Sequence, residues 1–424
     1  MADRDPLMTF GSCTCLTARV FSGWRGLMVL SKFKVGVMKQ VVPLIPQKTP
    51  ITYIGERMLL ETVKFLKMHN LGNLLIVTDG VLYKLGLLDE LCDELLKSNI
   101  NYHVYDQVKP DPTFDIVEDI VQTMDLNKCD SVMSFGGGSV IDCVKLASVA
   151  FTNHFKIADQ NGFLKLKNRG LPFIAVPTTC GTGSETTIVA VISDSVSHKK
   201  SSIISRKMIP DLTILDPFVT SKLPNSLAIY TALDALTHAL EAYVSGYASD
   251  ESNFYALSAI KLIFENLPYI AKNESTTDVR TALLTASFYA GIAFTRAFVG
   301  YVHAFAHQIG GMYGVPHGQA NAVLLPHIMN FYLPSCDKKF SEIYRYIYAE
   351  TDIKTSNNNE GIQFIKCLYK LLEDCNVEQT LNKFPKEGID KVIKDGFKEC
   401  HGFYAIPQYM KYKDAEKILR KVAV

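Results

Sequence analysis

Short apolar runs alternate with stretches of helical periodicity along residues 50–224. The runs that predict buried strands are LLIVTDG (74–80), NYHVYDQV (101–108), SVMSFGGG (131–138) and FIAVPTT (173–179). Between them, apolar residues recur at helical spacing over 81–98, over 113–125 and from Val140 onward. Strands that alternate with helices in this way predict a parallel sheet covered on both faces.

The pattern changes after Pro224, where segments of helical period follow one another with few β-branched runs. These segments span 226–245, 251–271, 277–297 and 299–312. Two prolines, Pro217 and Pro224, mark the boundary. We therefore predict an α/β N-terminal domain over residues 43–222 and an all-α C-terminal domain over residues 223–424.

Composition narrows the class of protein further. The 424 residues are 48% hydrophobic, and 44 Lys and Arg against 43 Asp and Glu leave a net charge of +1. These values exclude global disorder and the basic field of a nucleic-acid-binding protein. No uncharged apolar run reaches about 18 residues, so no membrane-spanning segment is expected. Ten Cys, of which only Cys13 and Cys15 lie close together, favour a reduced, cytoplasmic protein.

The charge is unevenly distributed along the chain. Residues 1–55 hold seven bases and two acids, so this stretch carries +5 and the other 369 residues carry −4. Residues 16–42 combine Val, Leu, Met and Phe with interspersed bases. We assign residues 1–42 as a basic leader. Its composition fits an interfacial helix with peripheral membrane contact, an organelle transit segment, or a poorly ordered leader or helix lying on the body.

The motif GGGSVID (136–142) follows a predicted strand and opens a predicted helix. Its glycines let backbone N–H groups approach an anion, and the helix N-terminus adds partial positive charge, so the turn suits a pyrophosphate. The motif is not G-x-G-x-x-G, and it lacks the Lys of a Walker loop. On spacing alone, a tight strand-to-helix connection is an equally good interpretation.

Two further features at strand ends suit a nucleotide. PTTCGTGSETT (177–187) concentrates hydroxyl groups and glycines after a strand and offers donors to a phosphate or a ribose. Its alternative interpretation is a solvated loop with a helix cap at Ser184. Asp79 ends the strand LLIVTD, where a carboxylate can bind a ribose and disfavour a 2′-phosphate. Without other context, a turn-forming Asp before Gly80 explains this residue better.

Histidines and one aspartate form the most specific pattern in the sequence. Asp234 and His238 are four residues apart in a segment of helical period, so both project from one face. His303, His307 and His317 follow within fifteen positions of one another. Three imidazoles and one carboxylate suit a divalent metal such as Fe(II) or Zn, and the ligand types do not choose between these ions.

The motifs occur in the order and at the intervals typical of one family. GGGSVID, PTTCGTGSE, DALTHALEAY and GYVHAFAH…GVPHG resemble the iron-containing (group III) alcohol dehydrogenase family, from about residue 43 to about residue 420. The resemblance implies a dinucleotide-binding α/β domain over 43–222 and a helical metal-binding domain over 223–424, in a dehydroquinate synthase-like architecture. It also implies that cofactor and metal meet in the cleft between these domains.

The resemblance assigns roles to individual residues. It implies metal ligands at Asp234, His238, His303 and His317. His307 is implied to line the site, and it is our candidate for relaying a proton, while Phe294 is implied to line the alcohol pocket. Cofactor contacts are implied at Asp79, Gly137, Gly138, Ser139, Asp142, Thr178, Thr179 and Lys200. Asp79 favours NAD, with NADP as the alternative.

The implied reaction is hydride transfer between NAD(H) and a small primary alcohol or aldehyde, catalysed by a homo-oligomer such as a dimer. Two departures from the family pattern lie near the implied cleft: Cys180 replaces an Ala, and Thr295-Arg296 replaces a pair containing Asn. Arg296 leaves open a 4-hydroxy acid dehydrogenase if its side chain points inward. A hydroxyacid–oxoacid transhydrogenase is a second alternative, whereas the motifs disfavour a non-redox enzyme of the dehydroquinate synthase type.

Overall fold

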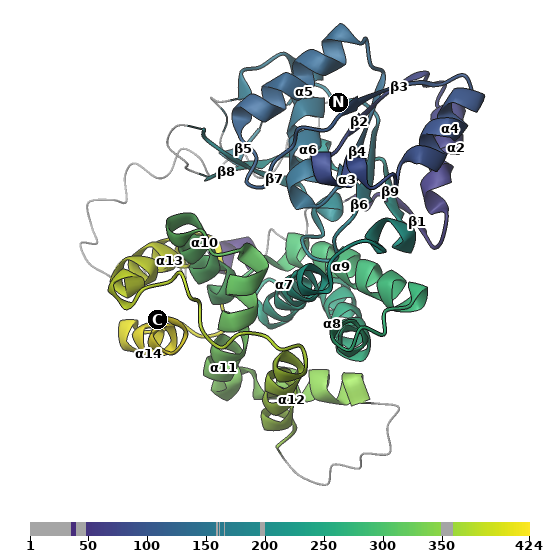
Figure 1. Ribbon diagram of the computed structural model, residues 1–424. Coiled ribbons are helices and arrows are strands. Elements are labelled where there is room, and N and C mark those ends of the chain that lie inside the picture. The colour runs from purple at the N-terminus through teal and green to yellow at the C-terminus, as the bar shows by residue number, and fades with distance from the viewer. Residues whose placement is uncertain are drawn as a thin grey trace.

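The computed structural model describes residues 35–39, 48–157, 160, 162–164, 166–195, 200–348 and 359–424. Nearly all of the predicted leader, residues 1–42, lies outside the described residues. Figure 1 shows an α/β domain built from the earlier elements and, beside it, a domain built from the later helices.

A six-stranded sheet forms the centre of the first domain. In spatial order its strands are β1 (Ile51–Ile54), β9 (Leu212–Leu215), β6 (Phe173–Pro177), β4 (Ser131–Gly136), β2 (Asn73–Val77) and β3 (Asn101–Tyr105), all parallel. The chain moves outward from β2 to β3 and then returns past β2 to β4. The carboxyl ends of β2 and β4 therefore flank the point where the strand order reverses, which is where open parallel sheets bind ligands.

Neighbouring residues of β2, β4 and β6 enter two separate cores. Leu75 of β2 packs into the core on one face of the sheet, and Ile76 packs into the core on the other. The helices that cover the faces are α5 (Phe114–Leu126) and α6 (Gly138–Asn153) on the first side and α2 (Glu61–Met68) and α4 (Asp89–Lys97) on the second. The prediction of a parallel sheet covered on both faces is confirmed.

Five strands of the structure have no counterpart in the sequence pattern. Strands β1 and β9 contain four residues each, and β1 is largely exposed, so neither gives a recognisable apolar run. The other three, β5 (Gly162–Phe163), β7 (Val189–Ser193) and β8 (Lys200–Ile204), form a second small sheet. Strands β7 and β8 pair antiparallel, and β7 follows directly after residues 177–187, here called the hydroxyl-rich loop.

The second domain is helical. Its helices are α7 (Asn225–Val244), α8 (Asp250–Ala271), α9 (Thr277–Ala297), α10 (Tyr301–Tyr313), α11 (His317–Tyr348), α12 (Glu360–Asp374), α13 (Ile389–Phe403) and α14 (Tyr412–Val422). The first four agree with the predicted segments to within two residues. Helix α7 is buried over most of its length because α8, α9 and α11 pack around it.

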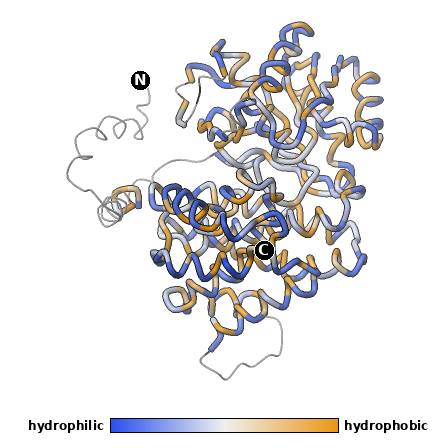
Figure 2. Tube along the Cα trace, turned by 60° about the vertical axis from the view of Figure 1, so that its left-hand side comes forward, coloured by the Kyte–Doolittle hydropathy of each residue, from blue (hydrophilic) through white to orange (hydrophobic). Residues whose placement is uncertain are grey.

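The two domains contact each other through glycines. Gly183 has a φ of +56°, and a Cβ on it would lie 2.6 Å from the Cα of Gly291 in α9. A Cβ on Gly291 would meet the carbonyl oxygen of Gly183 at 2.7 Å. Backbone therefore touches backbone where the hydroxyl-rich loop crosses α9. In Figure 2 the trace between the two domains is largely pale, the colour of residues with intermediate hydropathy.

Two further features concern the redox state of the cysteines and the length of the apolar helices. The eight cysteines in the described part of the chain are free thiols. Cys13 and Cys15 lie outside that part. Among the described residues no single helix is both long and apolar enough to cross a membrane, and only α9 and α10 together, bent by 103°, pass on length and composition.

We expect Gly183→Ala to destabilise the protein, because it places a side chain on a left-handed backbone where α9 leaves no room. The free energy of unfolding, measured by urea denaturation, should fall by about 1–3 kcal/mol. Gly311→Ala is the matched control, since no atom lies within 4 Å of its added Cβ. Alanine at position 311 should be neutral or stabilising in a helix. Equal unfolding midpoints for the two variants would contradict the tight contact.

Candidate metal centre

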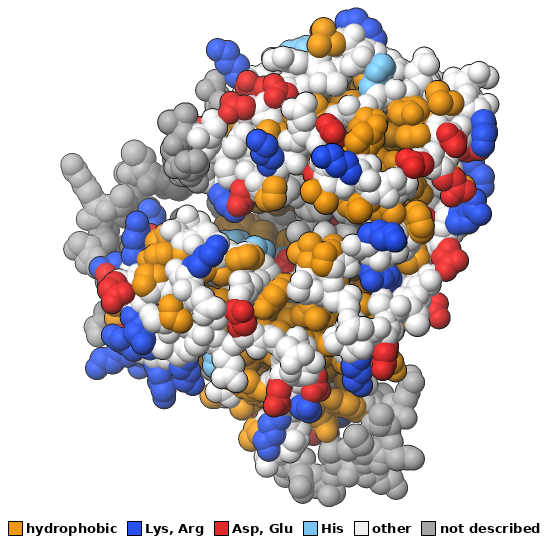
Figure 3. Space-filling view, in the orientation of Figure 1, with side chains coloured by type: hydrophobic (Ala, Val, Ile, Leu, Met, Phe, Trp, Pro, Cys, Tyr) orange, Lys and Arg blue, Asp and Glu red, His pale blue; other side chains and the backbone are white. Residues whose placement is uncertain are grey.

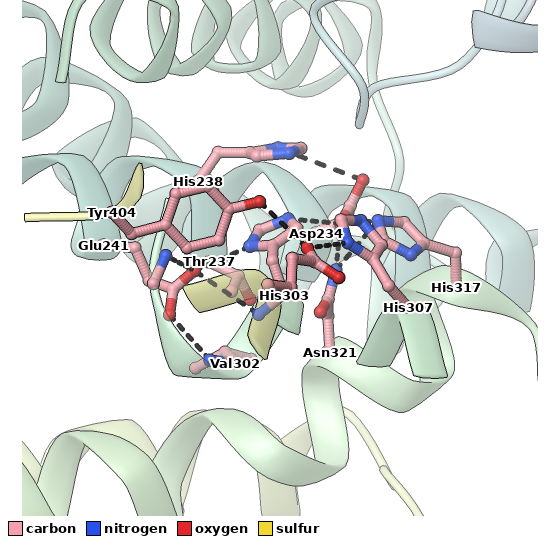
Figure 4. Close-up of polar contacts among 12 residues, drawn as sticks. Asp234, Thr237, His238, Glu241, Val302, His303, His307, His317, Asn321 and Tyr404 are labelled. Atoms are coloured by element: carbon pink, nitrogen blue, oxygen red, sulfur yellow. Dashed lines mark hydrogen bonds and ion pairs between the residues drawn. The ribbon is translucent and has the colours of Figure 1, made fainter. Parts of the chain in front are cut away.

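Four side chains from three helices converge in the helical domain (Figure 4). Asp234 and His238 lie one turn apart on α7, and both are buried. His303 is buried in the first turn of α10. His317 begins α11, and its side chain is 41% exposed. The structure therefore brings together all four residues implied as metal ligands, with His317 at the rim.

The atoms of this cluster fit a metal ion. One ligand atom each from Asp234, His238 and His303 lie within 4.8 Å of one another, and His317 Nε2 lies 3.4 Å from Asp234 Oδ1. Among the described residues, His238 Nδ1 and His303 Nε2 are buried without a hydrogen-bond partner. Buried polar atoms nearly always have one. A divalent ion shared by these side chains would satisfy both nitrogens.

Burial and charge set the protonation of the cluster. Burial lowers the pKa of His238 to about 3, so its imidazole is neutral, which is the form that binds metal. Burial also opposes charge on His303, but the neighbouring carboxylates of Asp234 and Glu241 outweigh it and raise the pKa of His303 to about 9. The pKa of Asp234 lies well below its usual range, because the neighbouring histidines outweigh burial. The cluster therefore favours positive charge at its centre.

Glu241 is a site residue that the sequence analysis missed. It is buried on α7, and its carboxylate accepts hydrogen bonds from the backbone N–H groups of Gly300 and Val302 at 2.8 and 2.7 Å. His303 Nδ1 lies 2.7 Å from Glu241 Oε2. The carboxylate thus turns His303 Nε2 toward the cluster, as carboxylates behind metal-binding histidines commonly do. Its place three residues after His238 on one helix face is the signal that could have found it.

Asn321 is a second residue that the sequence did not reveal. It is fully buried on α11, and its Nδ2 donates to Asp234 Oδ1 at 2.6 Å. The same nitrogen lies 3.1 Å from His317 Nε2. Asn321 therefore contacts members of the cluster on two helices and fixes the Asp234 carboxylate within it.

His307 lies beside the cluster rather than within it. Its ring stacks on that of His317, with centroids 5.3 Å apart and planes 13° apart, and its centroid lies 5.8 Å from that of His303. The His307 side chain is 41% exposed. Figure 3 shows histidine side chains in the hollow between the two domains. The site therefore opens to that hollow.

The turn formed by Gly136, Gly137 and Gly138, here called the glycine turn, faces the hydroxyl-rich loop. Gly137 is the N-cap of α6, and Gly138 and Ser139 follow in its first turn. A Cβ on Gly137 would lie 3.2 Å from Thr179 Oγ1, and a Cβ on Gly138 would meet Thr182 Cγ2 at 2.7 Å. Only glycine lets the loop approach this closely. The N–H groups that open α6 lie in this turn, where they suit an anion.

Asp142 takes part in a buried network that holds the loop. Its carboxylate accepts hydrogen bonds from Ser184 Oγ and, at 2.9 Å, from the backbone N–H of Val191. Lys145 is fully buried and donates to Ser184 Oγ at 2.8 Å. Burial lowers the pKa of Lys145 to about 8. Asp142 and Thr178, which is only 2% exposed, therefore contribute chiefly to the shape of the loop.

Asp79 and Lys200 lie on opposite sides of the glycine turn in the sequence, and each has a protein partner. Asp79 is the N-cap of a short helix, and its Oδ1 accepts both hydrogen bonds, from the N–H groups of Val81 and Leu82. The Asp79 carboxylate thus caps this helix through one oxygen, and its other oxygen accepts neither of these two bonds. Lys200 Nζ pairs with Asp111 Oδ1 at 2.6 Å. Desolvation and, more weakly, the charges of His307, His303 and Lys200 lower the pKa of His317 to about 4.

The hydroxyl-rich loop reaches the metal centre directly. The backbone of Gly181 lies close enough to the His238 ring to favour its charged form, and the ring stacks on Phe294, with centroids 4.2 Å apart. The guanidinium of Arg296 forms an ion pair with Glu251, at 2.9 Å. Arg296 is therefore engaged by a carboxylate of this chain.

Comparison with known proteins agrees with this arrangement. The family described as iron-containing alcohol dehydrogenase matches residues 49–217, and the C-terminal domain of the Fe-containing alcohol dehydrogenase family matches residues 228–423. Alcohol dehydrogenase 4 of Schizosaccharomyces pombe is 42% identical over 65% of this chain and 66% of its own length. The NAD-dependent methanol dehydrogenase of Bacillus methanolicus is 36% identical over 69% of this chain and 77% of its own. A crystal structure of 1,3-propanediol oxidoreductase superposes with a TM-score of 0.83 at 31% identity, covering 88% of this chain and 98% of that one. The chain belongs to the iron-containing alcohol dehydrogenase family.

Proposed function

We propose that this protein is a metal-dependent alcohol dehydrogenase and aldehyde reductase that transfers hydride between NAD(H) and a small primary alcohol or aldehyde. One observation carries the proposal: the hydroxyl-rich loop contacts His238, so a cofactor held by that loop lies against the metal cluster. Fe(II) is the proposed ion, and Zn is the alternative. The proposed ligands are Asp234, His238, His303 and His317.

The residues of the chain hold cofactor and substrate in contact. When bound, the ion supplies a Lewis acid for the substrate oxygen and the nicotinamide supplies the hydride carrier. Glu241 fixes the ring of His303, and Asn321 fixes the carboxylate of Asp234. Phe294, stacked on His238, provides an apolar wall that limits water around the reacting atoms.

We propose that His307 carries the proton of the reaction. Oxidation of a primary alcohol removes a hydride from carbon and a proton from oxygen. His307 accepts that proton and passes it to solvent, and the direction reverses in aldehyde reduction. Its half-exposed ring, stacked on His317 at the rim, suits this transfer.

NAD is proposed as the cofactor, with the glycine turn and the hydroxyl-rich loop as its site. The contacts are proposed at Gly137, Gly138, Ser139, Asp142, Thr178, Thr179 and Lys200, with Asp142 and Thr178 acting through the shape of the loop. Asp79 supports NAD over NADP, because a carboxylate beside the ribose disfavours a 2′-phosphate. The NAD dependence of the related methanol dehydrogenase supports the same choice.

An uncharged substrate is proposed. A 4-hydroxy acid dehydrogenase or a hydroxyacid–oxoacid transhydrogenase needs a cation for the substrate carboxylate. Arg296 is paired with Glu251, and Lys200 is paired with Asp111. Both cations would have to exchange one carboxylate for another, which favours the simple alcohol or aldehyde.

Several features stay predictions from the sequence. These are the homo-oligomeric state, the cytoplasmic location, the absence of a nucleic-acid partner and the peripheral membrane contact of residues 1–42. The domain limits at 43–222 and 223–424 are likewise proposed.

Protein purified anaerobically with Fe(II) should oxidise NADH in the presence of a small aldehyde such as propanal, and NADPH less well. Asp234→Ala and His303→Ala should lose bound metal and lower kcat on the order of 1000-fold, because the Lewis acid contributes several kcal/mol. Chelation followed by reloading with Fe(II) or Zn is the control. Absence of NADH and NADPH oxidation with every aldehyde would contradict the function. Hydroxyacid-dependent reduction without net NADH consumption would favour the transhydrogenase.

We expect Glu241→Ala to weaken metal binding about 10- to 100-fold, because His303 loses the carboxylate that orients it. The dissociation constant can be measured by competition with a chromogenic chelator. The free energy of unfolding should fall by about 1–3 kcal/mol, since buried N–H groups lose their acceptor. Glu241→Gln retains an acceptor oxygen and should recover part of both losses. Unchanged metal affinity in Glu241→Ala would contradict the orienting role.

His307→Ala should lower kcat about 100-fold, which is typical of a lost general acid–base group. Metal content, measured by inductively coupled plasma mass spectrometry, should stay at the wild-type level because His307 lies outside the cluster. Loss of metal from this variant would instead make His307 a ligand.

A further inference from the structure

A carboxylate from the end of the chain contacts His307. Helix α13 places Glu399 Oε1 2.7 Å from His307 Nδ1, although the two residues are 92 positions apart in the sequence. The Glu399 side chain is 27% exposed, whereas the His307 side chain is 41% exposed. The pair therefore lies at the inner edge of the hollow beside the metal cluster.

Glu399 is itself held in place by two further donors. Gln308 Nε2 donates to Glu399 Oε2 at 2.8 Å, and the Tyr404 hydroxyl donates to Oε1 at 2.9 Å. Burial would raise the pKa of Glu399, but His307 and the Tyr404 hydroxyl lower it below its ordinary value. Both carboxylate oxygens are thus engaged, and the side chain has little freedom to turn away from His307.

This arrangement fixes which nitrogen of His307 is available. Nδ1 is engaged by the carboxylate, so in the neutral imidazole the proton is held on Nδ1 and the lone pair is on Nε2. The stack on His317 fixes the plane of the ring. Nε2 is the nitrogen left to contact a substrate oxygen or a water molecule.

We propose that Glu399 is a positioning residue for proton transfer, holding the His307 ring so that Nε2 faces the substrate. This inference rests on the proposed function, in which His307 carries the proton between the alcohol oxygen and solvent. Glu399 does not touch the substrate and acts only through His307, with Tyr404 and Gln308 keeping its carboxylate in place.

A simpler interpretation is that the contacts of Glu399 only tie α13 to α10. A purely structural contact of that kind would affect stability whether or not His307 is present. If Glu399 acts by positioning His307, replacing Glu399 should have no further effect on kcat once His307 has been replaced. The two interpretations therefore differ in a double-mutant cycle.

The experiment compares Glu399→Ala with Asp395→Ala, which removes a carboxylate one turn earlier on the same helix. Steady-state kinetics with NADH and propanal should show kcat lowered about 10- to 100-fold in Glu399→Ala, a change typical of lost orienting carboxylates, with KM changed less than about 2-fold. Glu399→Gln should recover part of kcat, because its amide oxygen can still accept from Nδ1. Asp395→Ala should match the wild type, and metal content should be equal in all variants.

The double variant His307→Ala, Glu399→Ala should be no slower than His307→Ala alone. A further loss of kcat in the double variant, or wild-type kcat in Glu399→Ala, would overturn the proposal. The proposal would also be overturned if replacing Glu399 lowered both kcat and the unfolding midpoint to the same extent in the wild-type and His307→Ala backgrounds. That result would favour a purely structural contact between α13 and α10.

A second measurement does not depend on activity. In protein labelled with ¹⁵N-histidine, the ring nitrogens of His307, assigned by their loss in His307→Ala, should report the Nδ1–H form. Glu399→Ala should shift the population toward Nε2–H, and an unchanged ring signal would overturn the proposal. If the wild type oxidises no NADH with any aldehyde, the proposed function fails. The ring signals then still decide whether Glu399 positions His307.

Discussion

The carboxylate of Glu241 is the interaction on which the metal centre depends. It is buried on α7 and accepts hydrogen bonds from backbone N–H groups that open α10 and from the His303 ring. A buried carboxylate is tolerated only where donors surround it. Gly300 leaves the room for this approach, because a Cβ there would lie 2.8 Å from Glu241 Oε1. One side chain thus fixes both the start of a helix and the orientation of His303, a proposed metal ligand, on that helix.

Direct contacts also join the hydroxyl-rich loop to the helices of the proposed metal centre. Gly183 touches Gly291 through backbone atoms, and Gly181 contacts both Thr231 and His238. The loop is therefore set directly on α7 and α9, the helices that carry His238 and its stacking partner Phe294. Hydride transfer requires reacting atoms about 3–3.5 Å apart, and a direct contact transmits position better than a long, flexible connection.

The sequence predicts the parts of this protein that repeat locally, and it misses those that depend on distant partners. The strand at 73–77 and the pair Asp234 and His238 follow from short-range spacing, so they are recognisable without a structure. Strand β9 is missed because its four residues, three apolar and one threonine, are too short a run to distinguish a central strand from a turn. Glu399 is missed because its partner lies 92 positions away, and only the docking of α13 on α10 brings them together.

The charges around His303 explain why the centre suits a divalent ion and an uncharged substrate. Its Nδ1 lies 2.7 Å from Glu241 Oε2, and its Nε2 lies 3.7 Å from Asp234 Oδ1, so the ring is sandwiched between two buried carboxylates. With neutral imidazoles, those carboxylates carry a formal charge of −2 that burial makes costly unless it is compensated. A divalent cation compensates it fully, whereas a single proton on His303 compensates only half. The resulting centre has no surplus positive charge for a substrate carboxylate, and Arg296, which departs from the family pattern, is already neutralised by Glu251. An anionic substrate would therefore lose its hydration without gaining a partner, and a neutral alcohol or aldehyde would not.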